Sequence, residues 1–115
     1  MKLVKGLLAL SIGAVIAAQS MSVQAKELTI GFSQIGAESE WRTANTNDVK
    51  AAAKKHGVDL KFSDAQQKQE NQIKAIRTFI AQKVDLIGFV PIVATGWDNI
   101  LREAKRAKIP VLIMD

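Results

Sequence analysis

The densest group of residues able to do chemistry lies in the segment QIGAESEWR. Within five consecutive positions it places two carboxylates, a hydroxyl, an indole and a guanidinium: Glu38, Ser39, Glu40, Trp41 and Arg42. Carboxylates and guanidinium groups pair with the hydroxyls of a sugar, and an aromatic ring stacks on the sugar's C–H face. The segment therefore carries the groups that a sugar-binding loop needs.

The same segment also fits the start of a helix. In that interpretation Glu38 and Glu40 complement the positive end of the helix dipole. Ser39 then caps the first turn, and Trp41 packs in the core. Spacing alone supports the two interpretations equally, so both stay open.

Two aspartates, Asp64 and Asp115, each follow a segment predicted as a strand. An aspartate at such a position can accept hydrogen bonds from two sugar hydroxyls, or it can cap the loop that follows. For Asp64 we favour the capping role.

Four segments that could position these residues have the pattern of strands: Glu27–Ser33, Val58–Phe62, Leu86–Val90 and Ile109–Met114. Val58–Phe62 alternates strictly between apolar and polar residues, which predicts a strand at a sheet edge. Leu86–Val90 and Ile109–Met114 are apolar throughout, as strands covered on both faces are.

Three helices are predicted between the strands, each from a stripe of residues at helical spacing. The stripes are Trp41, Val49, Ala52, Ala53 and His56, then Ile73, Ile76, Phe79, Ile80 and Val84, and then Trp97, Ile100, Leu101 and Ala104. Gly57 supplies a left-handed stop, so His56 is expected at a helix end and not in catalysis. Thr95 is expected to cap the third helix, with Asp98 three residues later.

This order of elements, β-α-β-α-β-α-β, predicts an α/β fold with a parallel sheet and helices on both faces. An edge-type second strand fits the strand order 2-1-3-4. The reversal beside the first strand creates a crevice at the carboxyl ends of the strands, where ligands bind. We therefore expect function in Gln34–Trp41, Asp64–Gln67 and Pro91–Trp97, and in whatever follows Asp115.

Residues 1–25 have the pattern of a secretory signal peptide. Lys2 and Lys5 give a positive start, Gly6–Ala18 is uncharged and mostly apolar, and small residues precede a cut after Ala25. The apolar stretch is short for a membrane span, which takes roughly 20 residues. We expect a mature chain of residues 26–115 in the periplasm.

Composition excludes several classes of function. The 115 residues include no cysteine and one histidine, so they offer neither a thiolate nor a histidine cluster for a metal. Without the two lysines of the signal, 14 of the 16 basic residues remain against 11 acidic ones. The sequence contains no run of basic residues that would indicate a nucleic-acid partner. Dinucleotide, phosphate-loop and nucleophile-elbow motifs do not occur. We expect no catalytic residue, no metal and no cofactor.

Three stretches resemble one family: GFSQIGAESEWRTANT, DAQQKQENQIKAIRTFIAQKVD and PIVATGWDNILREAKRAKIPV. They are similar to periplasmic solute-binding proteins of sugar ABC transporters, specifically to the galactofuranose-binding type within the ribose and galactose group. The resemblance covers residues 26–115. It implies two α/β lobes joined by a hinge, with a monosaccharide such as galactofuranose, galactose or ribose between them and a membrane permease as partner.

The resemblance also implies which residues contact the sugar: Glu38, Ser39, Glu40, Trp41, Arg42 and Asp115. Glu40 departs from the family pattern, which has a small residue there. The hinge and second lobe do not follow Asp115, so we expect an N-terminal lobe truncated within its sheet. Two alternatives remain open, namely the sensing lobe of a signal-anchored receptor and a fragment of a periplasmic α/β enzyme.

Overall fold

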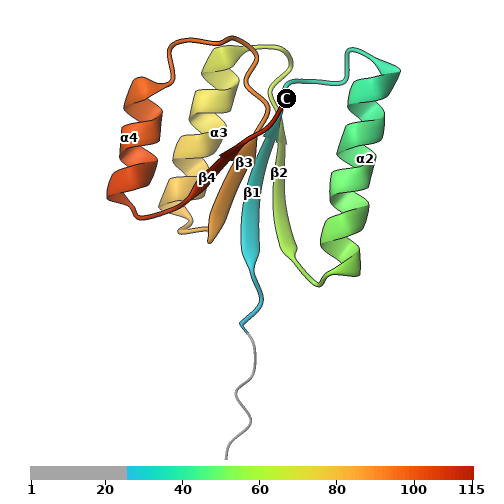
Figure 1. Ribbon diagram of the computed structural model, residues 1–115, viewed down its shortest axis with the longest axis horizontal. Helices are drawn as coiled ribbons and strands as arrows, with labels where there is room; N and C mark the ends of the chain where they lie inside the picture. The colour runs from blue at the N-terminus through green and yellow to red at the C-terminus, as the bar shows by residue number, and fades with distance from the viewer. Residues whose placement is uncertain (1–25) are drawn as a thin grey trace, which may run out of the picture.

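Four parallel strands and three helices make up the computed structural model, which describes residues 26–115 (Figure 1). The elements are β1 (Thr29–Gln34), α2 (Glu40–Lys55), β2 (Asp59–Asp64), α3 (Gln69–Ala81), β3 (Leu86–Phe89), α4 (Asp98–Arg106) and β4 (Val111–Ile113). The α/β class and the alternation of elements are thus confirmed. The signal peptide and its cut after Ala25 concern residues outside the described part.

The strands lie in the order β2-β1-β3-β4, as predicted. The parallel register pairs Gln34 with Asp64 across β1 and β2, and it pairs Phe89 with Ser33 on one side and with Ile113 on the other. The carboxyl ends of all four strands therefore meet at one edge of the sheet, which we call the carboxyl edge (Figure 1).

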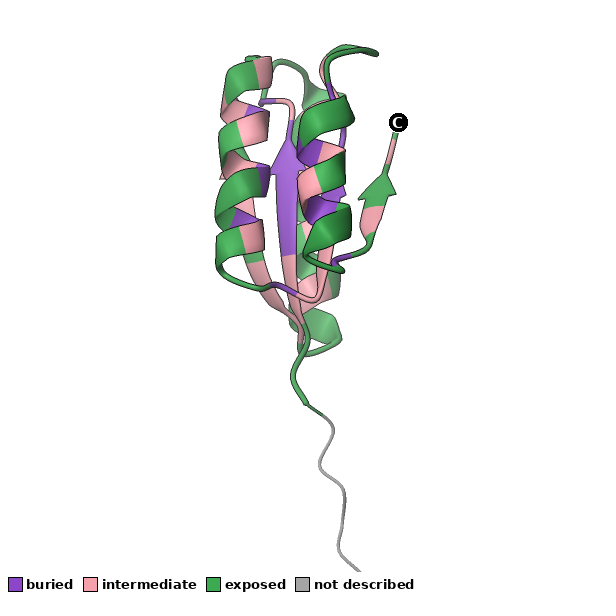
Figure 2. Cartoon of the chain, turned by 90° about the vertical axis from the view of Figure 1, so that its left-hand side faces the viewer, coloured by how far each residue is buried: buried purple, intermediate pink, exposed green. Residues whose placement is uncertain are grey.

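The core lies between the sheet and the helices α3 and α4, where Figure 2 shows the buried residues. Its members come from both layers: Ile76, Phe79, Val84, Ile87, Phe89, Trp97, Ile100 and Ile109. The helix α3 approaches β1 closely, because a Cβ built on Gly31 would lie 2.4 Å from Cγ of Phe79. A glycine at this position lets the ring pack directly on the strand backbone.

The other face of the sheet is covered by α2 alone (Figure 1). No residue of α2 is buried, and an apolar groove runs between Val49 and Ala53 of the helix and Ile30 and Phe32 of β1. The stripe predicted for this helix is thus present, but it is not buried. One helix with small alanine side chains is too narrow to cover a four-stranded face.

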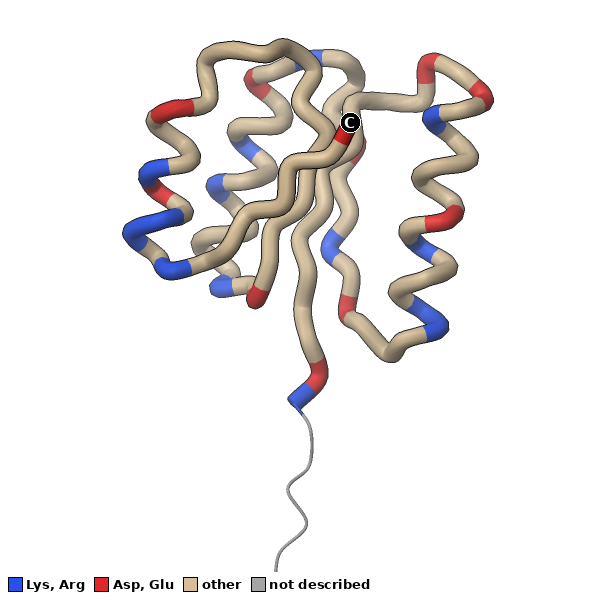
Figure 3. The backbone as a smooth tube through the Cα atoms, in the orientation of Figure 1, with Lys and Arg blue, Asp and Glu red and all other residues tan. Residues whose placement is uncertain are grey.

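All three helices end in the same way, with a left-handed residue and the paired backbone hydrogen bonds of a Schellman motif. Gly57 has this conformation after α2, as predicted, with His56 at the helix end. Lys83 and Lys108 take the same place after α3 and α4, although neither is a glycine. The helix α4 has the acidic Asp98 in its first turn and the basic Lys105 and Arg106 in its last, as the colours of the backbone in Figure 3 indicate, and this distribution complements the helix dipole.

Three details differ from the prediction. Trp97, and not Thr95, precedes α4, and no side chain caps this helix. Val84 lies beyond the end of α3 but still packs in the core, because the left-handed turn at Lys83 directs the chain back to the sheet. The strand β4 is shorter than Ile109–Met114, and Leu112 and Ile113 in it are half exposed.

Candidate functional site at the carboxyl edge

The first loop begins at Gln34, the last residue of β1, whose side chain is 0% exposed. Its Nε2 donates to Oδ1 of Asn45 at 2.8 Å and to Oγ1 of Thr46 at 3.1 Å, both on α2. Its Oε1 accepts from the backbone N–H of Ile35 at 3.0 Å. The amide thereby connects the end of the strand, the start of the loop and the helix.

The segment that follows is a helix start, as one of the two interpretations predicted. Ser39 is the N-cap of α2, and its Oγ accepts a hydrogen bond from the backbone N–H of Arg42 at 3.1 Å. Glu40 lies in the first turn, where a carboxylate complements the dipole. The core position predicted for Trp41 is wrong, because its side chain is 61% exposed.

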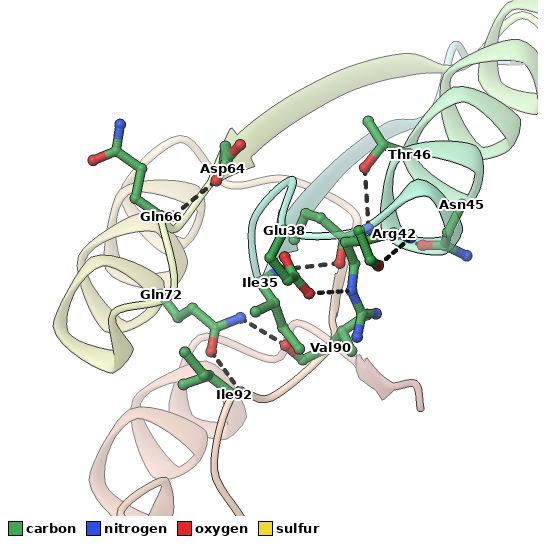
Figure 4. A network of polar contacts seen from close by, with 12 residues as sticks. Ile35, Glu38, Arg42, Asn45, Thr46, Asp64, Gln66, Gln72, Val90 and Ile92 are labelled. Atoms are coloured by element: carbon green, nitrogen blue, oxygen red, sulfur yellow. Dashed lines mark hydrogen bonds and ion pairs between the residues drawn. The ribbon is translucent and has the colours of Figure 1, made fainter.

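Glu38 and Arg42 form an ion pair inside this segment (Figure 4). Arg42 Nε donates to Glu38 Oε1 at 3.1 Å, and the guanidinium lies 5.0 Å from the ring centre of Trp41. The pKa of Glu38 is below its ordinary value, chiefly because its own backbone N–H donates to the carboxylate, and Arg42 lowers it further. Glu38 is therefore an anion that orients the arginine.

Nη1 of the Arg42 guanidinium takes no part in this ion pair. The side chain is 16% exposed, and within the described residues its buried Nη1 has no hydrogen-bond partner. A buried donor without a partner is unfavourable unless a ligand or water satisfies it. The arrangement therefore leaves a buried, positively charged donor without a partner beside an exposed indole.

The second loop is joined to the first by backbone hydrogen bonds. The N–H of Gln67 donates to the carbonyl of Ile35 at 2.7 Å, and the N–H of Ala65 donates to the carbonyl of Gln34 at 3.0 Å. Asp64 Oδ1 accepts from the N–H of Gln66 at 2.8 Å, which is the capping role that we favoured. Asp64 therefore shapes this loop.

The third loop is held by α3. Gln72, which is buried, donates to the carbonyl of Val90 at 2.7 Å and accepts from the N–H of Ile92 at 3.0 Å (Figure 4). Trp97 is in the core, as predicted, and its Nε1 donates to the carbonyl of Val93 at 2.7 Å.

Asp115 lies just past β4, where the N–H of Met114 continues the pairing by donating to the carbonyl of Phe89. Its exposed carboxylate makes no hydrogen bond or ion pair to the first loop within residues 26–115. The structure thus gathers the five residues of the first loop and leaves Asp115 separate from them, although at the same carboxyl edge (Figure 1).

Sequence reasoning missed the buried glutamines Gln34 and Gln72, and the signal was there to find them. Gln34 continues the face of β1 to which Phe32 belongs, and Gln72 lies four residues before Ile76 on the buried stripe of α3. A polar side chain at a core position is buried with hydrogen-bond partners.

Neither a metal centre nor a membrane span is found in the described part of the chain. No group of three or more His, Asp or Glu side chains among residues 26–115 could hold a metal ion. No helix in that range is long and apolar enough to cross a membrane.

Comparison with known proteins relates this chain to sugar-binding proteins. The chain is 57% identical over 106 residues to the galactofuranose-binding protein YtfQ of Escherichia coli, covering 92% of this chain and 33% of the relative. It is 39% identical over 88 residues to the fructose import binding protein FruE of Bifidobacterium longum, covering 76% and 27%. The chain thus spans about a third of the length of the curated relatives that it matches.

A solved structure and a protein family agree with these relatives. The arabinose-binding component of an ABC transporter from Shewanella, bound to L-arabinofuranose, matches with a TM-score of 0.75 and 67% identity, covering 76% of this chain and 29% of that protein. Residues 30–115 match the periplasmic binding protein domain. The chain therefore belongs to the periplasmic binding protein domain family.

Proposed function

We propose that residues 26–115 form the N-terminal lobe of the solute-binding component of a sugar ABC importer, with a furanose such as galactofuranose as ligand. The chain belongs to the periplasmic binding protein domain family. The observation that carries the proposal is that, within the described residues, Nη1 of Arg42 has no hydrogen-bond partner and lies beside the exposed indole of Trp41. The relatives are named for galactofuranose, fructose and arabinofuranose.

The proposed binding mode follows from the chemistry of these groups. Arg42 donates to the ring or hydroxyl oxygens of the sugar, and Glu38 keeps the guanidinium oriented. Trp41 stacks on the C–H face of the sugar, and Asp115 accepts from its hydroxyls. Ser39 supports the loop as helix cap, and Glu40 lies at its exposed rim. No catalytic step is assigned.

A hybrid protein provides the test, because the proposed cleft needs a second lobe. Residues 26–115 of this chain replace the matching segment of YtfQ, and calorimetry measures binding of galactofuranose, galactose and ribose. Arg42→Ala should weaken binding about ten- to a hundredfold, since a hydrogen bond to a charged group contributes roughly 1.5–3 kcal/mol. Trp41→Ala and Asp115→Ala should also weaken it.

Arg77→Ala is the matched control. Arg77 is likewise paired with a glutamate, at 2.8 Å from Glu103, but it lies on the outer surface between α3 and α4. Its loss should leave sugar affinity unchanged. Equal affinity in the Arg42, Trp41 and Asp115 variants would mean that the first loop is a helix start and nothing more.

Export to the periplasm belongs to the same proposal, and it rests on the signal pattern of residues 1–25. N-terminal sequencing of the exported protein should begin at Lys26. Recovery of Met1 on membrane-bound protein would instead indicate an uncleaved anchor.

A further inference from the structure

We propose that Gln34 is a positioning residue, whose buried amide holds α2 on the sheet and thereby sets where Arg42 lies at the carboxyl edge. The inference rests on the proposed function, because Arg42 is taken as the group that donates to the sugar. It concerns how that group is placed.

The first step is that packing does not hold α2 firmly. None of its residues is buried, and the apolar groove lies between it and the sheet. By contrast, α3 and α4 bury Ile76, Phe79 and Ile100 against the same sheet. A helix with little buried apolar surface is free to shift unless polar contacts fix it.

The second step is that Gln34 supplies those contacts from inside the sheet layer. Its two donor bonds reach Asn45 and Thr46, and its acceptor bond returns to Ile35, so three bonding positions of one buried amide are satisfied. These are the side-chain hydrogen bonds that join α2 to the sheet in the described residues. Farther along the helix, α2 also contacts β2 through a cation–π interaction, in which Nζ of Lys50 lies 4.3 Å from the ring centre of Phe62.

The third step links the amide to Arg42. Asn45 and Thr46 follow Arg42 by three and four residues, so the three side chains share one face of α2 (Figure 4). The pair with Glu38 ties Arg42 only to its own loop, four residues earlier. Gln34 is therefore the group that fixes the position of this face of the helix relative to the carboxyl ends of the strands.

The test uses Gln34→Met in the hybrid protein, because methionine preserves length and volume but makes no such hydrogen bonds. We expect sugar affinity to fall about tenfold, as when a charged donor loses its alignment with the ligand. We also expect faster hydrogen exchange of the backbone amides in the first half of α2, a readout that needs no ligand.

Two comparisons separate positioning from a general loss of stability. Ile100→Val removes one buried methyl group from α4, and it should lower the melting temperature without changing sugar affinity or the exchange of α2. In an Arg42→Ala background, Gln34→Met should cause almost no further loss of affinity, because the two residues act through one contact.

The outcomes are distinguishable. A full additional loss of affinity in the Arg42→Ala background, or unchanged exchange of α2 in Gln34→Met, overturns the inference. If the parent hybrid binds none of the three sugars, the proposed function fails, and the exchange experiment still decides whether Gln34 holds the helix.

Discussion

Replacing Gly31 by alanine tests whether α3 is held by direct contact of Phe79 with the backbone of β1. The new Cβ would lie 2.4, 2.5 and 2.8 Å from three carbons of the Phe79 ring. Favourable contact between carbons needs about 3.5–4.0 Å, so the ring would have to move by roughly 1 Å. Phe79 is buried among core residues on both layers, which leaves it little room.

Overpacking of this kind costs about 1–3 kcal/mol of unfolding free energy. At about 2–4 °C per kcal/mol for a large domain, Gly31→Ala should lower the melting temperature of the hybrid protein by about 2–12 °C. Scanning calorimetry measures this shift. Alanine at position 79 lacks the three carbons that the new Cβ would meet, so Gly31→Ala should cost less in a Phe79→Ala background than alone.

Gly88→Ala is the matched control in the same sheet. Its Cβ would lie 3.3 Å from Cδ2 of Phe32, a side chain that borders the open groove under α2 and can move into it. Its effect should therefore be clearly smaller than that of Gly31→Ala. Equal effects at the two glycines, or strict additivity of Gly31→Ala with Phe79→Ala, would refute the argument from close approach.

Three further predictions concern helix ends, acid stability and the β4 edge. Lys108→Gly should stabilise the protein by up to about 1 kcal/mol in urea unfolding, because a left-handed residue with a side chain is strained, whereas Gly57→Ala should destabilise it. Arg77 lowers the pKa of Glu103, so this pair stabilises the folded state above the ordinary glutamate pKa and the effect is lost as the pH falls through the lowered value. Melting temperatures between pH 3 and 7 should accordingly fall less steeply with acid in Glu103→Gln. Residues 26–115 alone should self-associate and bind no sugar at micromolar concentrations, and Ile113→Lys on the exposed β4 should reduce association in sedimentation experiments without restoring binding; a soluble wild-type monomer with micromolar affinity would contradict this.

The sheet could be predicted from the sequence because its signals are local. Uninterrupted apolar runs such as Leu86–Val90 and the left-handed stop at Gly57 each depend on a few neighbouring residues. Right-handed crossovers then leave few ways to order the strands. These signals sufficed for the order β2-β1-β3-β4 and for the place of the loops.

Features that depend on distant partners could not be read in this way. Trp41 has the spacing of the apolar stripe of α2, but its burial depends on whether another part of the fold covers the indole, and here it is exposed. Lys83 and Lys108 end their helices in the same left-handed conformation as Gly57, but they are not glycines, so the sequence does not indicate such a turn there. The hydrogen bonds of Gln34 join residues 11 and 12 positions apart, so only the fold brings them together.

The contrast between the two indoles gives this chain a pair of optical probes. It contains two tryptophans and no tyrosine, so its near-ultraviolet emission comes from Trp41 and Trp97. Trp97 packs against Phe89 at a ring-centre distance of 4.9 Å, whereas Trp41 faces solvent. Iodide should quench the red-shifted emission of Trp41 and spare the blue-shifted emission of Trp97. Emission recorded with and without iodide therefore reports separately on the integrity of the core and on events at the carboxyl edge.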